Sequence, residues 1–372
     1  MKNKLLLYIL LSTILLLTAC KKDEPEMTEN NYTGLETGPN YIVKSPVKLG
    51  AARGSIINNI NNILDVKEIE EGLMELSKEE FPPEEYFVQE GQYLSGEMIN
   101  KWVSRKSKEN PEGFNPELKK GIDRMKAEKE NPKVLSHILE QNYIDKDGKV
   151  GGISIALALN KVYYIKYLDK DGLTQNGKVT IDNKTLEAEG KKIATELIKR
   201  LRNNENVPQT PILITLYKIE ENNSVKPGNF ISKMVIGKNK IEGNWEKINR
   251  KYLTLTYNDV DNIKRLDNPT YQSFTLFYEN VNKYFNNLDY KIYGLGLYEN
   301  DTLTKLKIEI ILGSITYPEN VALTQHIGSQ LESGVFPNHI PVIINVFDQE
   351  KVNKSLSIWD PIKKEVQSQI IQ

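Results

Sequence analysis

The chain has 372 residues, and its 49 lysines and arginines nearly balance its 50 aspartates and glutamates, for a formal net charge of −1. The sequence therefore does not predict a nucleic-acid-binding protein, which normally carries an excess of basic residues. Hydrophobic residues make up 39% and charged residues 27% of the chain, as in an ordinary folded protein, and the single cysteine excludes an internal disulfide.

The first twenty residues have the pattern of a bacterial lipoprotein signal. Lys2 and Lys4 give a positively charged start, residues 5–17 form an apolar run, and a Leu-Thr-Ala-Cys box ends at Cys20. Export machinery and a signal peptidase read this layout of charge, apolar core and small residues. The thiol of Cys20 is nucleophilic enough to take a thioether-linked diacylglycerol. We therefore predict a signal peptide over residues 1–19, cleaved between Ala19 and Cys20, and lipidation at Cys20.

A transmembrane anchor and an ordinary secretory signal are the alternatives to a lipoprotein signal. A membrane-spanning helix needs roughly 20 apolar residues, and the run over residues 5–17 is shorter. An ordinary secretory signal does not need a cysteine at the cleavage point. Both alternatives are therefore disfavoured.

Lipidation at Cys20 predicts an extracytoplasmic protein anchored in the cell membrane by acyl chains such as palmitate. Two buried acyl chains give stable anchoring at ~0.8 kcal/mol per CH₂ group. The expected partners during maturation are a diacylglyceryl transferase and a lipoprotein signal peptidase. Residues 20–50 are charged and poor in apolar residues, so we expect a flexible tether with a mean span of roughly 30 Å.

Helical and strand patterns alternate through residues 51–265. Apolar residues at helical spacing predict a helical region from Ser55 to Leu76, broken near Asp65, and Ser95 is a candidate cap for a short helix. Period-two alternation predicts a strand from Gly152 to Asn160 that pairs with residues 162–165 or their neighbours.

Two stretches repeat the same order of elements. A helical pattern over Leu186–Leu201 and a strand over residues 212–217 flank a two-proline turn, and a helix over Val321–Leu331 and a strand over residues 342–347 do the same. Before the second helix, residues 293–298 and 306–312 predict a hairpin. Unrelated α+β modules can share such a helix, turn and strand, but the matching order favours an internal duplication.

The sequence therefore predicts an α+β fold with two related helix-plus-antiparallel-sheet units, preceded by a helical N-terminal region. The first unit, with that region, spans residues 51–265, and the second spans residues 266–372.

Candidate catalytic and metal-binding residues are few. His137, His326 and His339 are far apart and lack the close spacing of zinc ligands. Ser154 stands in a sequence that approaches a nucleophile elbow, but the apolar alternation runs through it, so we expect it in mid-strand. The Asp-Lys-Asp-Gly sequence ending at Gly148 lacks the twelfth-position glutamate of a calcium loop and is expected to be a hairpin turn. We therefore predict no catalytic residues, no metal site, no cofactor and no enzyme activity.

Several motifs together resemble one known family. They are Glu90-Gly-Gln-Tyr-Leu-Ser95 with Trp102, Gly113-Phe-Asn-Pro116, Leu139-Glu-Gln-Asn-Tyr143, Gly152-Ile-Ser-Ile155 with Ala156-Leu-Ala-Leu-Asn160 and Val162-Tyr-Tyr164, Arg200-Leu-Arg202 and Pro227-Gly-Asn-Phe230. They are similar to the CamS family, lipoproteins of Gram-positive bacteria described as sex-pheromone precursors.

The resemblance implies an acylated, membrane-attached α+β protein whose pheromone comes from the released signal peptide and not from the folded part. The implied pheromone segment is Ser12, Thr13, Ile14, Leu15, Leu16, Leu17, Thr18 and Ala19.

Two hypotheses remain for the folded part. The first is a non-enzymatic module that binds a peptide, a wall polymer or a partner, and the aromatic residues that could supply contacts are Tyr163, Tyr164, Tyr217, Trp245 and Tyr252. The alternative is an extracytoplasmic enzyme that acts on cell-wall or peptide substrates through carboxylates. An apolar groove would favour binding, whereas a cleft with paired carboxylates or a buried acid with a shifted pKa would favour the enzyme.

Overall fold

The structure, a computed structural model, describes residues 40–43, 46–257, 263–285 and 289–371. The predicted signal peptide, Cys20 and the segment from Ser12 to Ala19 lie outside the described residues. Residues Thr37–Gln372 form one compact unit. None of the described helices is long and apolar enough to cross a membrane.

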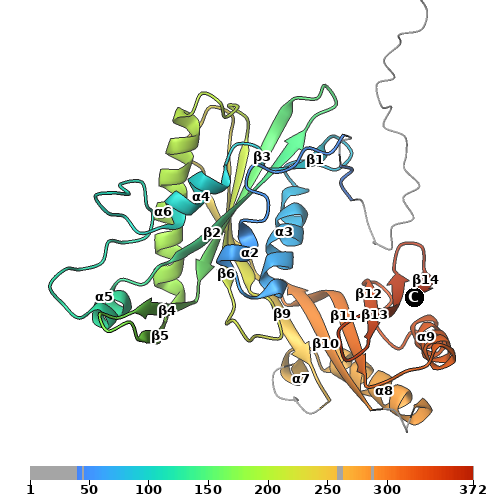
Figure 1. Ribbon diagram of the computed structural model, residues 1–372. Helices are drawn as coiled ribbons and strands as arrows, with labels where there is room; N and C mark the ends of the chain where they lie inside the picture. The colour runs from blue at the N-terminus through green and yellow to red at the C-terminus, as the bar shows by residue number, and fades with distance from the viewer. Residues whose placement is uncertain (1–39, 44–45, 258–262, 286–288, 372) are drawn as a thin grey trace, which may run out of the picture. The chain divides into compact units, whose positions relative to one another are not determined.

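The described elements mix helices and strands along the whole unit, which confirms the α+β fold (Figure 1). The helices are α2 (Ile56–Asn59), α3 (Ile63–Ser77), α4 (Gly96–Val103), α5 (Arg124–Glu130), α6 (Asn183–Asn203), α7 (Ile263–Leu266), α8 (Asn268–Tyr284) and α9 (Tyr317–Glu332). The strands are β1 (Phe87–Glu90), β2 (Leu135–Ile144), β3 (Val150–Asn160), β4 (Val162–Leu168), β5 (Thr174–Thr180), β6 (Ile212–Ile219), β7 (Asn229–Ile236), β8 (Trp245–Lys247), β9 (Arg250–Leu255), β10 (Tyr290–Glu299), β11 (Thr302–Leu312), β12 (Val342–Phe347), β13 (Asn353–Asp360) and β14 (Glu365–Ile370).

The first sheet has the strand order β1-β2-β3-β6-β7-β8. Strands β3 and β6 are parallel, with Ile153 opposite Ile212, and the chain between them forms α6. Helix α6 packs on one face of this sheet together with α4, and buried residues such as Leu197 and Ile99 join them to the strands in one apolar core.

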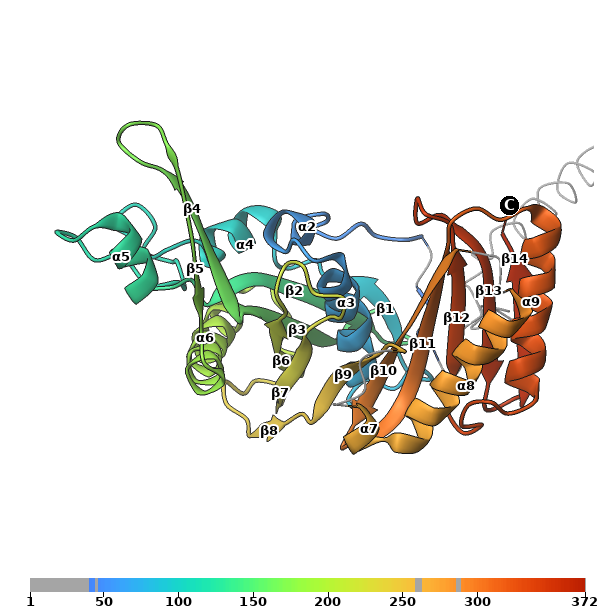
Figure 2. The ribbon, with the colours of Figure 1, turned by 90° about the horizontal axis from the view of Figure 1, so that it is seen from below.

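The second sheet repeats this connectivity in the order β9-β10-β11-β12-β13-β14. Strands β11 and β12 are parallel, with Leu306 opposite Val342, and α9 connects them. Helices α8 and α9 share a core with one face of the sheet through residues such as Phe274 and Leu323 (Figure 2). The matching strand order supports the predicted internal duplication, and the change from the first sheet to the second falls between β8 and β9.

Two details of the predicted sheets are wrong. Each sheet contains one parallel pair, so neither is antiparallel throughout. The strand over residues 150–160 does not pair with residues 162–165, because β4 pairs with β5 as a separate two-stranded ribbon. The hairpin predicted before the second helix is confirmed as β10 and β11.

Helix starts follow the polar residues that cap them. Ser95 accepts a hydrogen bond from the backbone N–H of Met98 at 3.2 Å, which confirms the predicted cap of α4. The helical region after Ser55 is broken three residues before the predicted point, because Asn62 caps α3 by accepting the N–H of Leu64 at 2.9 Å.

Helix α3 joins the two sheets. Its buried Ile69 and Leu73 pack on the face of the first sheet opposite α6. On another side of α3, the carboxylate of Glu68 lies 3.0 Å from Arg250 of β9, and each of these side chains is only 6% exposed. The hydroxyl of Tyr252, also on β9, donates to Glu68, so a buried charged cluster connects α3 to the second sheet.

The buried pair of Glu68 and Arg250 gives a stability prediction. The substitution Arg250→Met leaves Glu68 charged and without its cation inside the protein, so we expect the free energy of unfolding to fall by about 3–5 kcal/mol. Urea unfolding of a soluble form of residues 37–372, followed by circular dichroism, measures the change.

The control for this prediction is Lys101→Met, which breaks the surface pair between Lys101 and Glu112. These two side chains are 46% and 48% exposed, so the control should lose less than about 1 kcal/mol. Equal losses in the two variants would show that the buried pair does not hold the junction.

Candidate functional site

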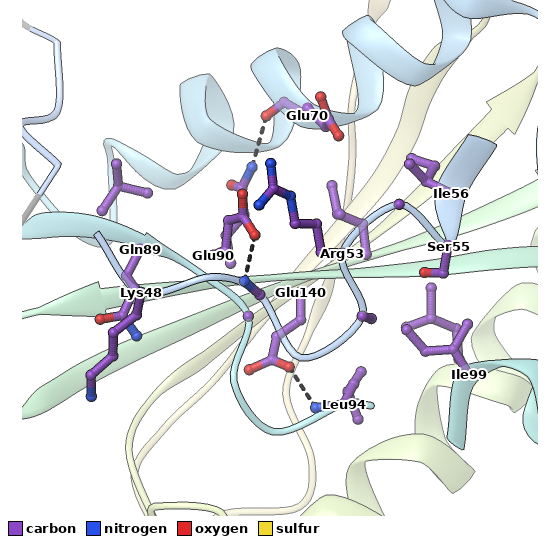
Figure 3. A pocket seen from close by; sticks show the side chains of 18 of the residues that line it. Lys48, Arg53, Ser55, Ile56, Glu70, Gln89, Glu90, Leu94, Ile99 and Glu140 are labelled. Atoms are coloured by element: carbon purple, nitrogen blue, oxygen red, sulfur yellow. Dashed lines mark hydrogen bonds between the residues drawn. The ribbon is translucent and has the colours of Figure 1, made fainter. Parts of the chain in front are cut away.

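A cavity of about 650 Å³ opens between the chain before α2, helix α3 and strands β1 and β2 (Figure 3). Its size lies in the range of pockets that bind small organic ligands. Most of its inner wall is apolar, and the residues that provide this wall include Ile56, Met74, Val88, Leu94, Ile99 and Ile138.

Glu140, on β2, lies at the wall of this pocket and is buried. Its carboxylate accepts the backbone N–H groups of Gln92, Tyr93 and Leu94 at 3.2, 3.1 and 2.8 Å. Burial raises the pKa of the Glu140 carboxyl, and these hydrogen bonds together with one from Asn142 oppose part of that rise. Glu140 therefore fixes the loop that leads into α4.

The loop held by Glu140 needs a glycine. A Cβ atom at Gly91 would lie 2.6 Å from the Cβ of Glu140 and 2.7 Å from its carbonyl oxygen, closer than atoms pack in proteins. The Glu-Gly-Gln motif at residues 90–92 thus reflects the close approach of this loop to β2.

Two more glutamates line the mouth of the pocket. Glu90, at the end of β1, accepts the backbone N–H of Gly50 at 2.6 Å and so holds the chain before α2 in place. Glu70, on α3, is exposed, and in the described part of the chain no hydrogen bond or ion pair reaches its carboxylate. Partial burial raises the pKa of the Glu70 carboxyl, and the negative charges of Glu90 and Glu71 raise it further.

The pocket also contains a buried histidine. His137 on β2 is 1% exposed, and its Nδ1 lies 3.1 Å from the side-chain nitrogen of Asn59. Burial lowers the pKa of His137 to about 4, so the ring is neutral at physiological pH. Because an amide nitrogen only donates, Nδ1 accepts this bond and the ring proton lies on Nε2. His137 is therefore a potential donor to a ligand.

A second buried acid, Asp65 on α3, lies outside the residues that line the pocket. One carboxylate oxygen accepts the hydroxyl of Tyr217 at 2.6 Å and the N–H of Gly228 at 2.7 Å. Burial raises the pKa of Asp65 to about 6 despite these hydrogen bonds. Its donors come from the first sheet, so Asp65 attaches α3 to that sheet.

The aromatic residues proposed as contacts do not form a binding surface. Tyr217 and Tyr252 are buried and bond to Asp65 and Glu68. Tyr163 donates to Glu128 at 2.9 Å. None of the five proposed aromatic residues lines the pocket.

The remaining sequence candidates lie apart from one another. Ser154 is buried in mid-strand, as predicted, and donates to the hydroxyl of Tyr143 at 3.2 Å. His326 stacks on Tyr284 with ring centroids 4.3 Å apart, and of the three histidines only His137 lines the pocket. Within the described ranges, no group of three or more His, Cys, Asp or Glu residues could hold a metal ion.

Sequence analysis missed the pocket itself. Its walls come from Val43 and from residues within 47–56, 70–74, 88–99 and 137–141, which are separated along the chain. The motif at residues 90–95 was a usable signal, although it was interpreted only as the start of a helix and as part of the family resemblance.

The shifted pKa of Asp65 predicts a pH dependence of stability. Because the folded-state pKa is raised from 3.8 to about 6, the stabilisation from protonated Asp65 is fully present below pH 4 and is lost as the pH rises through 6. The free energy of unfolding of the parent protein should therefore fall as the pH rises over this range. In Asp65→Asn, whose side chain does not titrate, this fall should be smaller by an amount on the order of 3 kcal/mol.

Urea unfolding at pH 4, 5, 6 and 7 measures this fall in the parent protein and in the variant. Asp147→Asn, in the exposed turn before β3, is the control and should leave the fall unchanged. The interpretation of Asp65 is wrong if the parent and Asp65→Asn lose equal stability over this range.

Comparisons with known proteins give a family for this chain. The family model described as CamS sex pheromone cAM373 precursor matches residues 47–360. No curated protein matches the chain.

Two solved structures are similar in fold. A sex pheromone precursor from Lactobacillus salivarius subsp. salivarius has a TM-score of 0.77 and 27% identity, and the match covers 91% of this chain and 98% of that chain. The C-terminal domain of the sex pheromone staph-cAM373 precursor from Staphylococcus aureus has a TM-score of 0.71 and 26% identity, covering 84% of this chain and 98% of that chain. Because the family model spans most of the sequence, including the pocket residues from Val47 onward, the chain belongs to the CamS family of sex pheromone precursors.

Proposed function

We propose that this protein is a lipoprotein held by lipid on Cys20 at the extracytoplasmic face of the cell membrane, and that its folded part is a non-enzymatic module. In this proposal the module binds a mainly apolar ligand in the pocket beside α3. The signal-like sequence that ends at Cys20 supports the anchor, and the pocket supports the binding role.

Maturation requires two reactions at one position. A diacylglyceryl transferase forms a thioether between the sulfur of Cys20 and the diacylglyceryl group of a phospholipid, whose glyceryl carbon–oxygen bond to phosphate breaks, so that the head-group phosphate leaves and the thiol proton is released. The signal peptidase then hydrolyses the peptide bond between Ala19 and Cys20 and releases the leader. The solved relatives are called sex pheromone precursors, and we propose that trimming of this leader yields a peptide pheromone from Ser12–Ala19.

We favour binding over catalysis because of the hydrogen bonds that the carboxylates in the pocket already make. Glu140 is saturated by backbone N–H groups and Glu90 holds Gly50, so both have structural partners. A general acid and base pair needs two carboxyl groups free to exchange protons with a substrate. The apolar inner wall instead offers burial to a ligand.

An enzyme acting on cell-wall or peptide substrates is the second candidate. The observation in its favour is that Glu70 and Glu90 share the mouth of the pocket and that the pKa of Glu70 is raised. Turnover of such a substrate that disappears in Glu70→Gln would favour this candidate over a binding module.

Filling the pocket tests the binding role. Ala52 lines the pocket and its neighbour Ala51 does not. We expect Ala52→Phe to weaken binding of the apolar fluorescent probe 1-anilinonaphthalene-8-sulfonate at least tenfold, a loss of about 1.4 kcal/mol, because the ring occupies the ligand's volume. Ala51→Phe is the matched control and should bind the probe as the parent does. Equal binding by the two variants, or none by the parent, contradicts the proposed site.

Replacing the acceptor of the lipid tests the anchor. In cells expressing Cys20→Ala, we expect the protein to keep its leader, because the signal peptidase has no lipidated cysteine to recognise. The parent should appear in the membrane fraction with the mass of a diacylglyceryl-modified chain starting at Cys20, and peptides from Ser12–Ala19 should appear only with the parent. Intact-mass spectrometry measures the mass of the protein, and peptide mass spectrometry detects the released peptides. Asn31→Gln is the control and should behave as the parent does.

The anchor proposal is wrong if the parent protein, with its cysteine intact, keeps the leader or is free in the culture medium.

A further inference from the structure

The mouth of the pocket carries charges of both signs. Glu70 and Glu90 line it together with Lys48 and Arg53. Figure 3 shows Arg53 on the side of the view where Glu90 and Glu70 lie, and Lys48 on the opposite side, pointing away from Arg53. Gln141 donates to the backbone carbonyl of Glu70 at 2.9 Å, but among the described residues no ion pair or hydrogen bond reaches the side-chain charges of Glu70, Lys48 or Arg53. One acid and two cations are therefore available to a ligand that enters the pocket.

The interior of the pocket carries hydrogen-bonding groups that can serve a ligand. His137 lines the pocket, and because its Nδ1 is engaged by Asn59, its Nε2–H is the ring donor left for a ligand. Ser55 stands at the N-cap of α2 but makes no capping bond, and its buried hydroxyl has no partner. An unsatisfied buried polar group costs about 1–3 kcal/mol, so a ligand that supplies acceptors here recovers this energy.

These groups define the chemistry of a ligand. The ligand needs an apolar body for the inner wall, oxygen acceptors for His137 and Ser55, and both a positive and a negative group for the mouth. A fatty acid has no cation, and an alkylamine has neither an anion nor a carbonyl oxygen. A short apolar peptide with free ends has all four features, and its size suits a cavity of about 650 Å³.

We infer that the pocket binds a short apolar peptide through its two free ends, an inference that rests on the binding role proposed above. The peptide ammonium lies at Glu70, its backbone carbonyl oxygens accept from His137 and Ser55, and its carboxylate lies at Arg53. Apolar side chains fill the cavity between α3 and β2.

The contributions of the charged ends are modest because Glu70 and Arg53 are exposed to solvent. Exposed charge pairs contribute far less than buried ones, so apolar burial supplies most of the affinity. The charged ends select the ligand, since neutralising one of them removes a specific interaction with one side chain.

Blocking each end of one peptide tests the inference. The probes are tri-leucine with free ends, its N-acetyl form and its C-terminal amide, each titrated calorimetrically into the soluble form of residues 37–372. We expect each block to weaken binding of the parent by roughly three- to tenfold. In Glu70→Gln, acetylation should no longer weaken binding, because the peptide ammonium has no carboxylate partner in that variant. In Arg53→Gln, amidation should no longer weaken binding, because the peptide carboxylate has no guanidinium partner.

Matched controls are Glu97→Gln and Lys126→Gln, exposed residues that do not line the pocket. Both should keep the full effects of blocking, and Ala52→Phe should lose binding of all three peptides.

The outcomes separate this inference from the proposed function. If the apolar fluorescent probe binds in the pocket but tri-leucine does not, or if all three peptides bind equally, the peptide inference is wrong and the binding module stands. If neither the probe nor the peptides bind, the proposed binding role itself is wrong.

Discussion

The structure depends on three sides of one helix. Successive residues of α3 are about 100° apart around its axis, so its fifteen residues present three distinct stripes. Asp65, Ile69 and Leu73 contact the first sheet, Glu68 bonds to Tyr252 of the second sheet, and Glu70 and Met74 line the pocket. A shift of α3 would therefore disturb the core of the first sheet, the junction with the second sheet and the wall of the pocket at once.

The two buried acids of α3 are compensated in different ways. Glu68 faces a cation, Arg250, which also lies 3.1 Å from Glu299, and burial still raises its pKa. Asp65 has only hydrogen-bond donors from the first sheet, and its second carboxylate oxygen has no partner in the described structure. Because removing charge from water costs more than these donors return, the pKa of Asp65 is raised to about 6. The junction thus depends on a paired charge, whereas the attachment to the first sheet depends on an acid held by hydrogen bonds alone.

The parts of this fold that sequence predicted are those encoded locally. Apolar spacing located α6 and α9, and Ser95 gave the start of α4, because helical periodicity and caps involve neighbours in the chain. The partner of β3 was missed because its parallel neighbour, β6, follows only after the β4–β5 ribbon and α6, and the nearer strand pattern at residues 162–165 was the plausible choice. The role of Glu140 was missed for another reason. Its partners are the backbone N–H groups of Gln92, Tyr93 and Leu94. Every residue but proline has such a group, so the residue types at these positions do not indicate that they bind a carboxylate.

The pocket lies between the first repeated sheet and the region added before it. Both sheets share one strand order, and each carries helices from its own half on one face. The other face of the first sheet is covered by α2 and α3, which precede the repeated elements in the chain. The pocket forms where this added layer meets β1 and β2. Its mouth includes Lys48 and Gly50, at the end of the predicted tether, so a ligand there would contact the part of the folded chain that is nearest in sequence to the proposed lipid anchor.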